Sequence, residues 1–143
     1  MNEAELIIDD ICQEGEEAHG GGVFTLTERI SYLKQYGRHS MSFSALQADM
    51  SYFDLEGVGY IAYRKQWGTV VCLGDPVCAI DKREELIDAF MAVYRNPVFI
   101  QVSRAIANLV HEKTGFYATQ FGKESLIDLQ KWSLSGKKKQ VIR

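Results

Sequence analysis

The sequence predicts an α+β fold in which a mixed, mainly antiparallel sheet has helices on both faces. Between residues 50 and 74 the chain is rich in β-branched and aromatic residues and has turn signals at Glu56-Gly57 and Trp67-Gly68, a pattern typical of an antiparallel meander. A segment with helical spacing then separates this meander from another short apolar run. Such a helical crossover joins parallel strands, so the predicted sheet is mixed.

We expect the first 22 residues to form an acidic, flexible leader with a short helix over Leu6–Cys12. Residues 1–17 contain seven acidic residues and no basic one, and residues 19–22 read HGGG. Three successive glycines cost too much backbone entropy inside a helix or strand. HGGG also occurs in esterase oxyanion holes, but that chemistry requires a GxSxG nucleophile motif, which the chain lacks. We therefore interpret residues 19–22 as a linker.

A helix is predicted to begin after Thr25. Thr25 and Glu28 have the spacing of a capping box, in which each side chain accepts a hydrogen bond from the other residue's backbone N–H. Apolar residues recur at helical spacing up to Tyr36, and Gly37 is a candidate left-handed C-terminal residue. Residues 42–50 are expected to add a short helical turn.

Three antiparallel strands are expected over residues 50–54, 58–65 and 69–74. The third is apolar on both faces, which favours a central position in the sheet. It ends at Gly74-Asp75-Pro76, where Asp75 can form an Asx-type turn. Tyr60 and Tyr63, three residues apart on the second strand, are expected on opposite faces.

The rest of the chain predicts two helices, one strand and a hairpin. Asp81 is the expected N-cap of a helix with one apolar stripe, made by Leu86, Ile87, Phe90, Met91 and Tyr94. Residues 98–103 predict a short buried strand, and the helix after Ser103 is expected to end at Gly115. Residues 116–129 predict a hairpin that turns at Gly122-Lys123, with Tyr117 in the core.

Composition narrows the class of protein. The 143 residues are 46% hydrophobic and 24% charged, which suits one globular domain. No apolar run approaches the roughly 20 residues of a membrane span, and no signal peptide is recognisable, so we expect a cytoplasmic protein. The three cysteines are expected to be reduced, and the spacing of Cys72 and Cys78 fits neither a CxxC redox pair nor a zinc site. No metal site is expected.

The order of elements is similar to that of the GCN5-related N-acetyltransferases (GNAT). Two stretches, YFDLEGVGYIAYRKQWGTVVCLGDPVC and GFYATQFGKESLIDLQKWSLSGKKKQVIR, resemble the DUF2156 family more narrowly. That family corresponds to the soluble C-terminal domain of phosphatidylglycerol lysyltransferases. The resemblance, over residues 24–143, implies two GNAT-like halves in tandem, of which this chain matches the first. It implies a GNAT-like half-domain over residues 23–130 and a basic C-terminal tail over residues 131–143.

The resemblance also implies an aminoacyl- or acyltransferase whose chemistry lies mainly in the second half and in the cleft between the halves. The active site is therefore expected to be incomplete in this chain, with a second half or self-association as partner. Aminoacyl-tRNA or acyl-CoA would be the donor, and the chain itself would hold no cofactor. The tail would contact the acceptor end of tRNA through Lys137, Lys138, Lys139 and Arg143, or simply be solvated. The alternatives are a non-catalytic binding or assembly module and a single-domain CoA-dependent acetyltransferase.

Three residues are candidates for substrate binding, and each also has a structural interpretation. Asp75 could bind an amine such as an aminoacyl α-ammonium group, or only form the turn. Arg64 could bind a phosphate or carboxylate, or be a solvated charge beside a hairpin. Ser103 could contact substrate or only cap a helix; as a nucleophile it would need a base, and no histidine is near it in sequence.

A CoA site in this fold would need a loop of the form Gln/Arg-x-x-Gly-x-Gly/Ala that aims backbone N–H groups at the pyrophosphate. The corresponding segment, residues 73–85, has one glycine, a proline without an N–H, and the two acids Asp75 and Asp81. This composition disfavours a phosphate at the segment.

Overall fold

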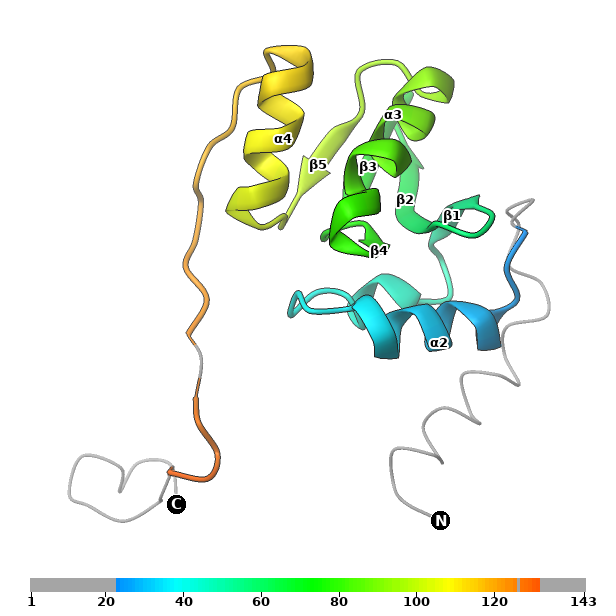
Figure 1. Cartoon of the computed structure of the whole chain (residues 1–143). Helices are drawn as coiled ribbons and strands as arrows, with labels where there is room; N and C mark the ends of the chain where they lie inside the picture. The colour runs from blue at the N-terminus through cyan, green and yellow to red at the C-terminus, as the bar shows by residue number, and fades with distance from the viewer. Residues whose placement is uncertain (1–22, 126, 132–143) are drawn as a thin grey trace.

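The computed structural model describes residues 23–125 and 127–131 and shows a mixed sheet between helices (Figure 1). Its elements are α2 (Leu26–Tyr36), the 3-10 turn η1 (Ser44–Leu46), β1 (Ser51–Leu55), β2 (Gly59–Gln66), β3 (Thr69–Leu73), β4 (Val77–Cys78), the 3-10 turn η2 (Ile80–Lys82), α3 (Arg83–Val93), β5 (Val98–Ile100) and α4 (Arg104–Thr114). The predicted order is confirmed up to Thr114, with β4 as an unpredicted addition. The expected helix over Leu6–Cys12 and the HGGG linker lie outside the described residues.

The sheet has the strand order β1-β2-β3-β5. β1, β2 and β3 are antiparallel neighbours, and β5 lies parallel to β3 after the α3 crossover, as predicted. β4 pairs with the start of β2 at Gly59 and Tyr60, while β3 pairs with the end of the same strand. Because β1 occupies the other edge of β2, β3 and β4 lie along one edge, and Gly74-Asp75-Pro76 interrupts that edge between them.

The two faces of the sheet bury different clusters, as the alternation of side chains along a strand requires. Ile61 and Tyr63 of β2 pack with Leu86, Ile87 and Phe90 of α3 and with Ile106 and Val110 of α4. Tyr60 of β2 packs on the opposite face with the apolar side of α2. The prediction that Tyr60 and Tyr63 lie on opposite faces is confirmed, and so is the placement of helices on both faces.

A buried ion pair joins α2 to the sheet. The Nη2 atom of Arg29 lies 2.5 Å from Oδ2 of Asp54, and the side chains are 9% and 1% exposed. The guanidinium group lies 4.1 Å from the centre of the Tyr52 ring, and the Tyr60 hydroxyl donates to the Arg29 carbonyl. The predicted capping box of Thr25 and Glu28 then fixes the start of α2.

Several local predictions were wrong. Gly37 ends α2 with φ −74° instead of a left-handed conformation, because its N–H bonds to the Leu33 carbonyl without needing a positive φ. Asp81 lies inside η2 and does not cap α3, whose N-cap residue Lys82 makes no capping hydrogen bond with its side chain. The predicted central position of β3, by contrast, is confirmed, although β2 is the more buried of the two strands, with residues 59–63 all buried.

The largest correction concerns residues 116–129. The predicted hairpin does not form in the described part of this range: residues 116–125 and 127–129 contain neither helix nor strand, and the segment after α4 runs away from the sheet (Figure 1). Tyr117, expected in the core, is 99% exposed. β5, expected to be buried, is half-exposed at Val98 and Ile100. Within the described residues β5 pairs only with β3, so no strand covers its other edge.

Candidate functional site

The turn Gly74-Asp75-Pro76 lies at the end of β3, next to the start of α4. Gly74 has φ +72°, which explains the requirement for glycine. Asp75 does not form the expected Asx-type turn. Its Oδ1 atom accepts a hydrogen bond from the backbone N–H of Ser103 at 2.7 Å, and the side chain is 7% exposed. The carboxylate therefore connects the end of β3 to the start of α4.

Ser103 occupies the predicted structural position. Its Oγ atom accepts the N–H of Ile106 at 3.4 Å and so caps α4, which ends at Gly115 with φ +71°, as predicted. Two of the three candidate substrate residues, Asp75 and Ser103, are thus adjacent. Both are already engaged in backbone hydrogen bonds, which is what a structural role requires.

Arg64 lies apart from this pair. Its Nη1 atom is 2.6 Å from Oδ2 of Asp49, and both side chains are more than half exposed. An exposed ion pair of this kind contributes little to stability and leaves the guanidinium accessible. The structure does not bring Arg64 together with Asp75 or Ser103.

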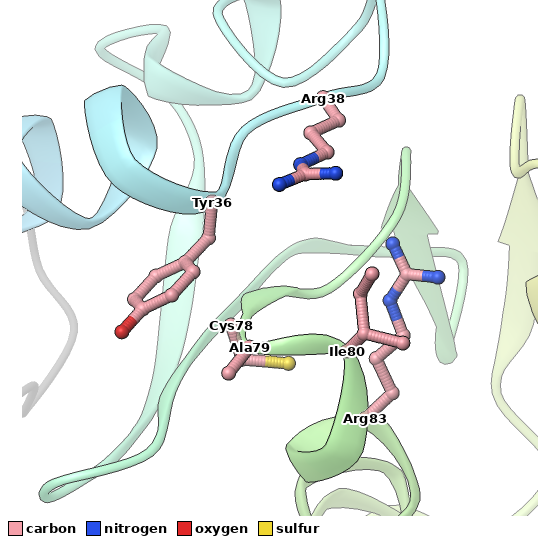
Figure 2. Close-up of a pocket in the computed structure, with 6 residues that line it drawn as sticks. All are labelled: Tyr36, Arg38, Cys78, Ala79, Ile80 and Arg83. Atoms are coloured by element: carbon pink, nitrogen blue, oxygen red, sulfur yellow. The ribbon is translucent and has the colours of Figure 1, made fainter.

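A pocket of about 160 Å³ lies between the end of α2 and the start of α3 (Figure 2). It is lined by Tyr36, Arg38, Cys78, Ala79, Ile80 and Arg83. The two arginines come from the segment after α2 and from the first residue of α3. The sequence pattern of residues 73–85 indicated neither arginine as a ligand-binding residue.

Arg83 connects the pocket to the turn. Its Nη2 atom lies 3.9 Å from Oδ2 of Asp75, a long ion pair, and its side chain is 18% exposed. Its Nε atom is buried and, among the described residues, has no hydrogen-bond partner. Buried charged donors without a partner are rare in folded proteins and call for an explanation.

Burial disfavours the thiolate form of Cys72 and Cys78. Cys78 lines the pocket, and burial raises the pKa of its thiol to about 11, although the nearby Arg83 charge opposes that shift. Burial also raises the pKa of the Cys72 thiol. Both groups are therefore neutral thiols near pH 7, whereas a nucleophilic cysteine needs a thiolate.

Other features bear on ligands and location. Among residues 23–125 and 127–131, no three histidine, cysteine or acidic side chains are grouped so as to hold a metal ion. Within the same part of the chain, no helix has both the length and the apolar character to span a bilayer. The basic residues Lys137, Lys138, Lys139 and Arg143 lie outside the described residues.

Comparison with known proteins identifies the family. The family described as "Phosphatidylglycerol lysyltransferase, C-terminal" matches residues 30–143. The chain belongs to this family. The phosphatidylglycerol lysyltransferase of Staphylococcus aureus strain COL is 32% identical over 119 residues, and that of Staphylococcus epidermidis is 31% identical over 127 residues. These matches cover 78% and 83% of the chain but only 14% of each relative.

Solved structures bear out the fold. L-PGS from Bacillus licheniformis superposes with a TM-score of 0.68 at 25% identity, over 81% of this chain and 37% of that one. The C-terminal DUF2156 domain of an Agrobacterium fabrum protein gives a TM-score of 0.63 at 21% identity, over 82% of this chain and 40% of that one. The predicted family and GNAT-like α+β fold are confirmed. The chain corresponds to well under half of each structural relative.

Proposed function

We propose that the chain is the first half of the catalytic domain of an aminoacyltransferase of the phosphatidylglycerol lysyltransferase type. The observation that supports this proposal most is the family match over residues 30–143, combined with coverage of only 37% of the L-PGS chain. In the reaction, a lipid hydroxyl oxygen would attack the ester carbonyl of aminoacyl-tRNA. A new ester bond forms, the ester bond to the ribose breaks, and the hydroxyl proton goes to the ribose oxygen.

The side chains of this half support a shaping role instead of a complete active site. Asp75 and Ser103 are held by backbone hydrogen bonds, and Cys78 is a neutral thiol. General acid–base or nucleophilic catalysis would need an accessible group with a suitable pKa, paired with an orienting partner. We propose that the second half supplies such groups.

We also propose that the second half adds to the β5 side of the sheet. β5 is paired on one edge only among the described residues, and Val98 is 45% exposed. Tyr117, Phe121 and Leu129 of the following segment are each more than 70% exposed. An open strand edge and exposed apolar side chains are features that a further domain can cover. We further propose that the protein is cytoplasmic and that tRNA is contacted by Lys137–Lys139 and Arg143.

The test is a transfer assay with lysyl-tRNA labelled in the amino acid and with phosphatidylglycerol vesicles. The chain alone should give no lipid-linked lysine, and a protein in which the second half from a full-length relative follows it should give product. Replacing Lys137–Lys139 with glutamine in that longer protein should weaken tRNA binding and reduce its salt dependence. Product from the chain alone would contradict the half-domain proposal. Micromolar binding of acetyl-CoA, measured by calorimetry, would favour the single-domain acetyltransferase instead.

A further inference from the structure

The pocket between α2 and α3 is lined by positively charged side chains, which the sequence alone did not indicate. Of the two acids expected to repel a phosphate in the 73–85 segment, Asp75 does not line the pocket and accepts its hydrogen bond from Ser103. Two arginines, Arg38 and Arg83, line it instead. Figure 2 shows their guanidinium groups approaching the same space from different elements.

Neither arginine is fully neutralised by the described part of the protein. Within residues 23–125 and 127–131, Arg38 takes part in no ion pair, and Arg83 has only the 3.9 Å approach to Asp75. The buried Nε of Arg83 also lacks a hydrogen-bond partner in that range. An oxyanion in the pocket would give the guanidinium groups charge-assisted hydrogen bonds, which are shorter and stronger than neutral ones.

We propose that Arg38 and Arg83 bind a single phosphate group carried by a small molecule or a lipid head group. Phosphate offers oxygens in several directions, which suits two guanidinium groups that come from separate elements. The 160 Å³ of the pocket equals the volume of about five water molecules, enough for one phosphate and a few carbon atoms. Cys78, Ala79 and Ile80 supply the apolar wall for those carbon atoms.

This site differs from the CoA loop of the fold, because side-chain guanidinium groups take the place of backbone N–H groups at a glycine-rich turn. It also does not suit an extended polyanion. The exposed acids Asp81 and Glu85 lie in and just after the segment that lines the pocket, whereas a nucleic-acid surface needs a row of basic residues. The proposal does not rest on the transferase function, because binding is measured without turnover.

The test is a titration of the full chain, followed by ¹H–¹⁵N NMR, with inorganic phosphate and with sn-glycerol 3-phosphate. Sodium chloride at matched ionic strength is the control. Saturable shifts are expected at the amides of Ala79 and Ile80 and at the Nε–H of Arg83. Arg38→Gln and Arg83→Gln should each weaken binding roughly tenfold or more, as loss of one charge-assisted contact implies. Arg95→Gln, which removes an exposed arginine outside the pocket, should leave it unchanged.

A second arm distinguishes the source of the phosphate. Vesicles of phosphatidylcholine with phosphatidylglycerol are compared with phosphatidylcholine alone, for the chain and its variants. Binding of vesicles that depends on both arginines assigns the site to a lipid head group, and binding of only the soluble compounds assigns it to a soluble phosphate. If circular dichroism shows that Arg83→Gln does not fold, Arg83→Lys, which keeps the charge, takes its place in the binding measurements. The proposal is overturned if no phosphate compound binds saturably, if Arg95→Gln loses as much affinity as the pocket variants, or if tRNA alone binds the site with a steep salt dependence.

Discussion

Replacing Asp75 with alanine should lower the free energy of unfolding by about 1.5–3 kcal/mol, because the change removes a hydrogen bond to a charged acceptor. Three observations set this magnitude. The hydrogen bond from the Ser103 N–H is short, at 2.7 Å, and the Asp75 side chain is only 7% exposed. Alanine also leaves the Ser103 N–H without this partner at the start of α4. The neighbouring Arg83 adds less, since its nearest approach to Asp75 is 3.9 Å.

The assay is urea unfolding followed by circular dichroism, with stability taken from the midpoint at constant m-value. Asp49→Ala is the matched control, because it removes an exposed carboxylate that pairs with Arg64 and should cost less than about 1 kcal/mol. Asp75→Asn keeps an oxygen acceptor, so its cost in free energy of unfolding should fall between those of Asp75→Ala and Asp49→Ala. A change below about 0.5 kcal/mol for Asp75→Ala would refute the structural role. The structural role would also be refuted if Asp75→Asn, in a protein that includes the second half, kept full stability but lost aminoacyl transfer.

Three further predictions follow from buried or constrained positions. Asp54→Ala leaves Arg29 buried without its partner and should cost about 3–5 kcal/mol in the same urea assay; a cost below about 1 kcal/mol would mean that the pair is dispensable. Gly59 has φ +154°, and the Cβ atom of Gly59→Ala would lie 2.2 Å from the Val77 carbonyl oxygen of β4. The substitution should therefore lower the melting temperature far more than Gly57→Ala, because Gly57 has φ +72° but no atom within 4 Å of an added Cβ. Equal losses in melting temperature would contradict the close approach of β4 to Gly59. The pKa of Cys78 rises to about 11 from its ordinary value of 9.0, so its contribution to stability is fully present below about pH 9 and is lost as the pH rises toward 11; fast reaction of the native Cys78 thiol with iodoacetamide at pH 7.5, measured by peptide mass spectrometry, would contradict this.

Those parts of the fold that depend on short-range sequence could be predicted. The capping box of Thr25 and Glu28 and the N-cap of Ser103 each need only residues within one helical turn. The meander β1–β3 follows from alternation and from turn glycines at positions 57 and 68, both with positive φ. The parallel position of β5 follows from the crossover. Of these features, only the pairing of β5 with β3 joins residues that are distant in sequence, and a helical crossover between two strands is enough to predict its direction.

The errors arose where a distant partner decides the structure. Residues 116–129 have the composition of strands, but strand residues are stabilised by cross-strand neighbours, and the described chain gives them none. The short β4 has no periodicity to detect and exists because Gly59 and Tyr60 pair with it. Arg38 and Arg83 line the same pocket because α2 packs beside β4 and α3 begins shortly after β4. A sequence reading that counted charges within one segment could not have found this pair.

The Gly74-Asp75-Pro76 turn explains how these long-range features fit together. It interrupts the edge of β2 between β3 and β4, so the chain leaves β3 and still returns to the sheet. Of the residues that follow, Cys78, Ala79, Ile80 and Arg83 line the pocket between α2 and α3. One carboxylate oxygen of Asp75 holds the start of α4 through the Ser103 N–H, and the other lies 3.9 Å from Nη2 of Arg83, which lines the pocket. The turn therefore joins an acid with a structural role to one of the basic residues of the pocket. A change such as Asp75→Ala can consequently alter stability and the position of Arg83 together, and only phosphate binding measured beside stability will distinguish the two effects.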